Sequence, residues 1–147
     1  MALLHTASVR ADLRTRLEAL RPDSQGRWGK MSIGQMLWHV NETMEAALGH
    51  VTLEPQNVPL PRPILKFIVI NLPWPKGAPT LKPWMPREDR YDFASERSRC
   101  LKLFDEVCAK SLDSPWPDSP SLGKMSGRDV SRLMAKHLNH HLTQFGV

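Results

Sequence analysis

Cysteine is scarce in this sequence, with only Cys100 and Cys108 among 147 residues and no CxxC pair. Both lie in one segment with helical spacing, where eight residues span about 12 Å. A disulfide needs its two Cα atoms within about 7 Å of each other. We therefore exclude a disulfide. Two isolated cysteines on a helix are usually small core or half-buried residues, so we expect these thiols to pack in or near the core, and a catalytic role is disfavoured.

Long apolar runs are also missing. The longest apolar stretch, residues 63–74, is interrupted by Lys66 and Asn71 and is much shorter than the roughly 20 residues of a membrane-spanning helix. The first ten residues contain too few apolar positions for the core of a signal peptide. We expect a cytoplasmic protein without a membrane partner. Its length predicts one domain, residues 1–147, with a single hydrophobic core.

A dense basic run is the third missing feature. The net charge is +5, but basic segments alternate along the chain with acidic ones. No run of Lys and Arg is interleaved with aromatic residues, as is typical of nucleic-acid-binding surfaces. The pattern indicates a mildly basic, solvated surface, and we expect no nucleic-acid partner.

The sequence does contain apolar residues at helical spacing. Four segments show this pattern, residues 8–20, 32–48, 95–112 and 126–145. Ser32 and Gln35 have the spacing of a capping box, and Ser126 with Asp129 supplies a cap and a first-turn carboxylate. Strand-like alternation and internal repeats are not evident. The pattern predicts an all-α fold, a bundle of four main helices.

Proline is concentrated between the second and third predicted helices. Nine of the 13 prolines lie between Pro55 and Pro86, which excludes a continuous helix or strand in this region. We predict one short buried helix at residues 64–72 and an extended loop elsewhere. Trp74 and Trp84 are expected to anchor this loop insertion to the bundle.

Histidine is concentrated near the end of the chain, in the run KHLNHHLTQFG that starts at Lys136. On a helix, His137 and His141 share the apolar, core-facing side and lie about 6 Å apart. His140 lies to one side and is expected to be more exposed. His39 can join the pair if the second and fourth helices face each other. Three such imidazoles are a recurring binding site for zinc and similar divalent ions.

Two further polar residues are candidates for roles around such a site. Gln144 projects in nearly the same direction as His137 and is placed to orient a ligand or a bound water. Glu42 follows His39 by about one turn and is a candidate fourth ligand or general base. The metalloprotease motif HExxH is absent, because the run reads HLNHH. From spacing alone, a metal site and a hydrogen-bonded core cluster of histidines are equally open.

Two segments resemble a known family. Residues 28–49 read WGKMSIGQMLWHVNETMEAALG and resemble the opening motif of the DinB-like superfamily, in which a tryptophan and a helix cap precede the first metal-binding histidine. Residues 122–146 read LGKMSGRDVSRLMAKHLNHHLTQFG and are similar to the closing motif of an uncharacterised branch with the ending HLxHHLxQFG. The resemblance implies a compact four-helix bundle with an up-down-down-up course and a pocket at one end. It also implies a divalent ion, commonly zinc or nickel, bound by His39, His137 and His141.

The resemblance extends to function. Characterised members of the superfamily include enzymes that use low-molecular-weight thiols, such as mycothiol-dependent maleylpyruvate isomerases and bacillithiol transferases. It therefore implies a metal-dependent transferase that uses such a thiol on a small-molecule substrate, or a hydrolase. Two other hypotheses stay open. One is a metal-stabilised or metal-sensing bundle without catalysis that acts as a homodimer. The other is a helical domain whose histidines only satisfy one another in the core.

Overall fold

The computed structural model describes residues 2–147. These residues form five α-helices and one short 3-10 helix, with one isolated β-bridge between Ser119 and Gly123 and no strand. The elements are α1 (Ala7–Ala19), α2 (Ile33–Leu48), α3 (Arg62–Asn71), η1 (Lys82–Trp84), α4 (Phe93–Ala109) and α5 (Gly127–Gln144). The predicted all-α class is confirmed.

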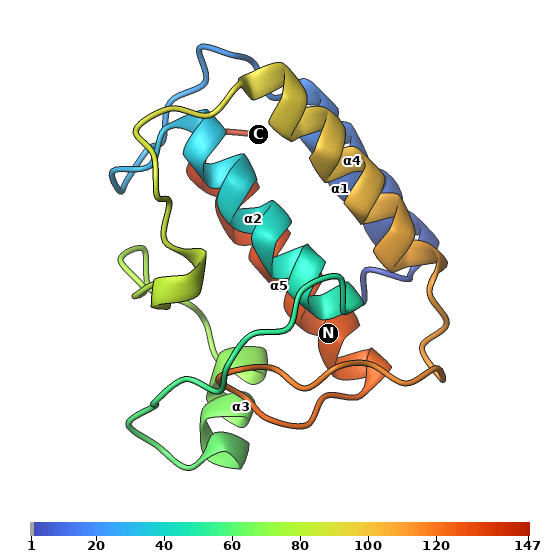
Figure 1. The fold of residues 1–147 in the computed structure, drawn as a ribbon. Coiled ribbons are helices and arrows are strands. Elements are labelled where there is room, and N and C mark those ends of the chain that lie inside the picture. The colour runs from blue at the N-terminus through green and yellow to red at the C-terminus, as the bar shows by residue number, and fades with distance from the viewer. Residues whose placement is uncertain (1) are drawn as a thin grey trace.

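The four long helices form a bundle in which each helix packs against two others (Figure 1). α2 lies along α4 and α1 lies along α5, while α2 also contacts α5 and α1 contacts α4. α1 and α5 run in one direction and α2 and α4 in the other, so the chain passes up, down, down and up (Figure 1). Because α2 and α4 are parallel neighbours, residues 49–92 must carry the chain back along the bundle.

One face of each long helix supplies the core. The large side chains that are almost completely shielded from solvent include Leu17, Met36, Leu37, Met44, Phe104, Leu138 and Leu142. Burying a side chain of this size stabilises the fold by about 1.5–3 kcal/mol. This shared core holds α2 and α5 in one register, and that register decides which polar side chains of the two helices meet.

Capping boxes begin α2 and α5. The sequence predicts the box at Ser32 and Gln35, and for α5 it predicts the Ser126 cap with Asp129 in the first turn. The Ser32 hydroxyl accepts from the N–H of Gln35, and the Gln35 side chain accepts from the N–H of Ser32. Ser126 and Asp129 form the same reciprocal pair at the start of α5. At its other end, α2 is followed by Gly49 with φ of 79°, a left-handed conformation that strains residues with a Cβ atom. These local signals explain why the predicted ends of both helices are nearly right.

α4 is displaced from its predicted position at residues 95–112. It spans Phe93–Ala109, because Asp92 rather than Ser95 is the cap: the Asp92 carboxylate accepts from the N–H of Ser95 at 2.9 Å. At the other end Lys110 is extended. The next residues form a turn in which the Trp116 indole donates to the Ser111 carbonyl at 3.1 Å.

The prediction of a short buried helix at residues 64–72 was wrong about burial, because the helix found there, α3, is only partly buried. It starts at Arg62 with a proline in its first turn, and Ile70 is its one buried residue. Ile64 and Phe67 are 52% and 61% exposed, and the helix lies beyond the end of the bundle (Figure 1). Its apolar composition suggested burial, but the helix packs mainly against α5, so one side stays in solvent. The loop that follows also contains η1, which was predicted as extended chain.

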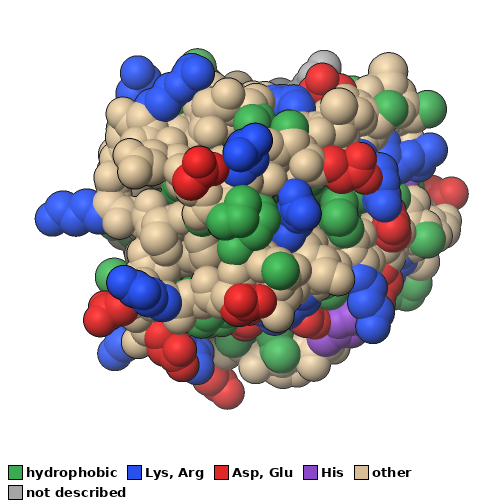
Figure 2. All heavy atoms as spheres, turned by 90° about the horizontal axis from the view of Figure 1, so that it is seen from above, with side chains coloured by type: hydrophobic (Ala, Val, Ile, Leu, Met, Phe, Trp, Pro, Cys, Tyr) green, Lys and Arg blue, Asp and Glu red, His purple; other side chains and the backbone are tan. Residues whose placement is uncertain are grey.

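Charges of both signs are interspersed on the surface. Figure 2 shows the molecule from above, with Lys and Arg side chains next to Asp and Glu around a few apolar side chains. This face has no continuous basic stripe. None of the helices in residues 2–147 combines the length and the apolar composition needed to cross a lipid bilayer.

Candidate metal centre

Three histidines from two helices meet inside the bundle. His39 comes from α2, and His137 and His141 come from α5; their exposed fractions are 5%, 8% and 6%. The Nε2 atom of His137 lies 2.9 Å from Nε2 of His39 and 3.1 Å from Nε2 of His141. One nitrogen from each ring falls within 4.8 Å of the others. The structure thus brings together the three residues that were predicted as metal ligands.

The ring of His39 is oriented by η1. Its Nδ1 lies 2.8 Å from the backbone carbonyl of Trp84. A carbonyl oxygen can only accept, so Nδ1 carries the hydrogen and Nε2 of the neutral ring is left with a free lone pair. The carbonyl is held at the end of η1, where the N–H of Met85 donates to the carbonyl of Lys82.

Gln144 sets the same tautomer on His141. Its amide nitrogen donates to the carbonyl of Trp28 at 2.9 Å, so its oxygen faces Nδ1 of His141, 2.8 Å away. That oxygen accepts from Nδ1–H, and Nε2 of His141 again keeps a free lone pair. The sequence placed Gln144 near the direction of His137. The structure instead places it behind His141, where it is buried.

Thr43 gives His137 the corresponding partner. Its hydroxyl donates to the carbonyl of Val40 at 2.7 Å, so the oxygen can accept from Nδ1–H of His137 at 3.4 Å. This is the longest of the three outer hydrogen bonds. Thr43 was not predicted to have a role. Its position four residues after His39, on the same side of α2, was the signal available in the sequence.

The three Nε2 lone pairs therefore point at one another. Without a cation or a shared hydrogen, the lone pairs of nitrogens about 3 Å apart repel each other. A buried acceptor without a partner also destabilises the folded state. Metal–nitrogen bonds of about 2.0–2.1 Å place the nitrogens of neighbouring imidazole ligands roughly 2.9–3.4 Å apart. Two of the three spacings, 2.9 and 3.1 Å, fall in this range, and the third pair of ligand atoms lies within 4.8 Å. The residues therefore fit a divalent first-row ion.

Burial keeps all three rings neutral. Desolvation lowers the pKa of His39, lowers that of His137 well below its usual value, and lowers the pKa of His141 to about 3. A positive charge on one ring also disfavours protonation of the next. Because neutral imidazole is the form that binds metals, the cluster is in its ligand form at neutral pH.

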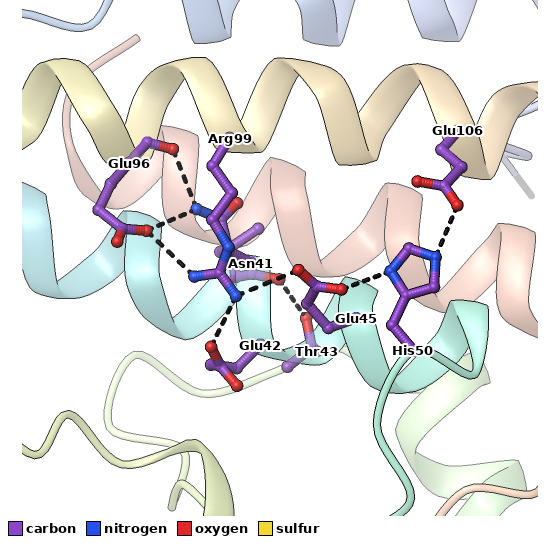
Figure 3. A network of polar contacts seen from close by, with 9 residues as sticks. Asn41, Glu42, Thr43, Glu45, His50, Glu96, Arg99 and Glu106 are labelled. Atoms are coloured by element: carbon purple, nitrogen blue, oxygen red, sulfur yellow. Dashed lines mark hydrogen bonds and ion pairs between the residues drawn. The ribbon is translucent and has the colours of Figure 1, made fainter.

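Glu42 is not brought to the histidines. Its carboxylate lies 2.7 Å from the Arg99 guanidinium of α4, which also contacts Glu45 and Glu96 at 3.3 Å each (Figure 3). It does not belong to the cluster of ligand atoms around the three rings. This ion pair holds Glu42 on the side of α2 that faces α4, which gives no support to its predicted role as fourth ligand or general base.

Aromatic rings border the cluster. The ring centroid of Trp74 lies 5.8 Å from that of His137 and 5.5 Å from that of His140, and Trp28 lies 5.7 Å from His140. The Trp74 indole donates to the carbonyl of Val69 at 2.8 Å. Trp74 therefore ties the proline-rich segment to α5. His140 is more exposed than the other two histidines of α5, but it is half-buried between two tryptophans rather than free in solvent.

A comparison with protein-family models matches most of the chain. The family model described as DinB superfamily matches residues 5–145. Comparison with curated proteins and with solved structures gave no match. The matched region includes all five α-helices, among them α2 and α5, which carry the histidine cluster. The chain belongs to the DinB superfamily.

Proposed function

We propose that this protein binds a divalent metal ion, zinc or nickel, through the Nε2 atoms of His39, His137 and His141. One observation carries the proposal: each Nδ1 already faces its own acceptor, so three free lone pairs converge. A metal-free core cluster would need a hydrogen on at least one Nε2. His39 and His141 can supply it only by losing outer bonds of 2.8 Å each, and His137 only by giving up its 3.4 Å contact with Thr43.

The reaction that fits this centre is transfer of a low-molecular-weight thiol to an electrophilic small molecule, with hydrolysis as the alternative. A bound divalent ion lowers the pKa of a coordinated thiol or water and so supplies a nucleophile near neutral pH. The chain contributes three neutral, oriented rings, and Trp74 shields one side of them. Its own thiols are unsuited to the reaction, because burial raises the pKa of Cys100 to about 12 and that of Cys108 to about 11. An external thiol is therefore the better nucleophile.

A non-catalytic role is favoured by a different observation. The three histidine residues are only 5–8% exposed, which leaves a substrate a narrow approach. In that case the ion would tie α2 to α5, and the metal-stabilised or metal-sensing bundle would act through self-association.

Metal content tests the site. Wild-type protein purified without chelators should contain about one equivalent of zinc or nickel by mass spectrometry, and His137→Ala should lose most of it, since two ligands bind such ions weakly. His50→Gln is the matched control, because His50 lies outside the cluster. Wild-type protein without stoichiometric metal, or equal metal in His137→Ala, would reject the proposal.

Activity separates the two functions. Metal-loaded protein is assayed with mycothiol, bacillithiol and glutathione against a panel of electrophiles, and in parallel against ester and amide substrates. Turnover that disappears in His137→Ala supports the enzyme. A metal-loaded protein that stays inactive, but dimerises only with metal bound, supports the non-catalytic function.

A further inference from the structure

A groove lies on the surface where α1 and α5 run side by side and the C-terminal end of α3 meets them. It has a volume of about 580 Å³, within the roughly 300–1,000 Å³ that is common for small-molecule sites. Its lining is mostly apolar and includes Val9, Leu13, Ile70 and Leu72. Leu72 is 46% exposed, which is unusual for a large apolar side chain beside a concave surface. None of the three clustered histidines lines this groove.

Arg132 brings an unpaired polar atom to the groove. Its Nε atom is buried and has no hydrogen-bond partner among residues 2–147, although the side chain lines the groove. A buried donor without a partner costs about 1–3 kcal/mol, and more when it is charged. Such an atom calls for an acceptor, and a carboxylate matches the fork of a guanidinium best.

The other charges of the groove leave an excess of positive charge. Asp12 is its one acidic residue, and this carboxylate pairs with Arg16 at 3.3 Å. Lys136 also lines the groove, and its ammonium group donates to the backbone carbonyls of Val69 and Leu72 at the end of α3. Carbonyl groups do not neutralise a charge, so Lys136 and Arg132 make the groove attractive to an anion.

We propose that this groove binds a small monocarboxylate with an apolar body, the carboxylate on Arg132 and the apolar body against Val9, Leu13 and Ile70. Charge complementarity selects the occupant: an anionic group pairs with the Arg132 guanidinium, while the apolar walls favour a ligand with an apolar body. The site does not depend on the metal centre, because its residues are separate from the three histidines.

Calorimetric titration with octanoate tests the proposal on the purified full chain. Wild-type protein should bind one octanoate saturably, and Arg132→Gln should weaken binding about tenfold or more, as expected for a hydrogen-bonded charge pair. Octan-1-ol, which lacks the charge, should also bind about tenfold more weakly. Arg128→Gln is the matched control: Arg128 is an exposed arginine one turn earlier on α5, lies outside the groove and should leave binding unchanged.

A second variant keeps the test decisive if Arg132→Gln folds poorly. Ser8 is exposed and lines the groove in the first turn of α1, where a carboxylate is well tolerated. Ser8→Asp should weaken octanoate binding by repulsion while the far-ultraviolet circular dichroism stays native. The proposal is overturned by a lack of saturable binding, by equal binding of octan-1-ol, or by variants that bind like wild type. A dimer that Arg132→Gln dissociates, without octanoate binding, would assign the groove to a second copy of the chain.

Discussion

Each imidazole of the cluster is oriented by a hydrogen-bond acceptor that a helical wheel does not reveal. The carbonyl of Trp84 faces His39, the Gln144 amide faces His141, and the Thr43 hydroxyl faces His137. Outer partners of this kind fix the tautomer and raise the basicity of metal-binding histidines. The affinity of the centre should therefore depend on residues that never touch the ion.

Gln144 gives the sharpest test at this scale. Gln144→Leu removes the acceptor of His141 and should weaken metal binding about 10- to 100-fold. Gln144→Glu keeps the acceptor for His141 but gives up the hydrogen bond to Trp28, so it should weaken metal binding less than Gln144→Leu does. Thr43→Val should have a smaller effect than Gln144→Leu, because its bond is longer, at 3.4 Å compared with 2.8 Å. Competition with a chromophoric chelator measures all three, and equal affinities for Gln144→Leu and wild type would contradict the assigned orientation.

The histidines themselves could be predicted to different degrees. His137 and His141 follow from their spacing on an amphipathic helix, since both fall on its apolar side. His39 was a candidate from its place on the second helix, but only on the condition that this helix faces the last one. Nothing local shows that contact, and the family resemblance supported it. The role of the Trp84 carbonyl could not be predicted from the sequence. Every residue has a carbonyl, and only the fold determines which one lies next to His39.

Between the elements α2 and α4, the polar contacts form a row rather than isolated pairs. Arg99 of α4 lies among Glu42, Glu45 and Glu96, and Glu45 also contacts His50, which reaches Glu106 (Figure 3). The row follows the parallel course of the two helices. It therefore fixes their register in addition to their apolar contacts.

Arg99→Met should destabilise the fold by about 1–3 kcal/mol, because it leaves the partly buried carboxylates of Glu42 and Glu96 without a cation and Glu45 with His50 alone. Urea unfolding measures the change. The matched control is Arg21→Gln, since Arg21 forms an ion pair whose partners are 77% and 80% exposed and should change stability by less than about 0.5 kcal/mol. Equal stabilities for the two variants would show that the Arg99 cluster contributes nothing to the interface.

His50 makes this interface sensitive to pH. The hydrogen bond to Glu45, together with Glu106, raises the pKa of His50 above its usual value. Protonated His50 therefore stabilises the folded chain at pH values below its ordinary pKa, and this contribution is lost as the pH rises through the raised value. His50→Gln should be less stable than wild type near about pH 5.5 and equal to it near about pH 9. Thermal unfolding across this range measures the difference, and a constant difference would contradict the assignment.

For the whole molecule, the metal should act as a tie between α2 and α5. Ion binding at 100 times the dissociation constant adds about 2.7 kcal/mol to the stability of the folded state. For a chain of this size, that corresponds to a rise in Tm of about 5–10 °C. Scanning calorimetry with zinc and with a chelator measures this shift in wild-type protein. His137→Ala is the control and should show almost none of it; a similar shift in the variant would place the stabilising ion elsewhere.

The helix positions of the bundle could be predicted more accurately than the structure of the proline-rich segment. Ser32 with Gln35 and Ser126 with Asp129 are local signals, so the starts of α2 and α5 were nearly right. The start of α4 was predicted two residues late, because the cap that begins it, Asp92, was not identified from the sequence. α3 was placed in the core because its residues are apolar, whereas burial depends on what the rest of the chain leaves uncovered.

The parallel course of α2 and α4 sets a minimum length for the linker between them, and the actual linker is longer than this minimum. A helix of 16 residues is about 24 Å long, a distance that about eight extended residues can cover. Residues 49–92 are several times longer than this return path requires. A shortened linker should leave the four-helix scaffold intact, but it would remove η1 and with it the carbonyl that orients His39. The length of residues 49–92 beyond this return path thus supplies the backbone acceptor that fixes the His39 ring, and a bundle with a minimal linker would lack it.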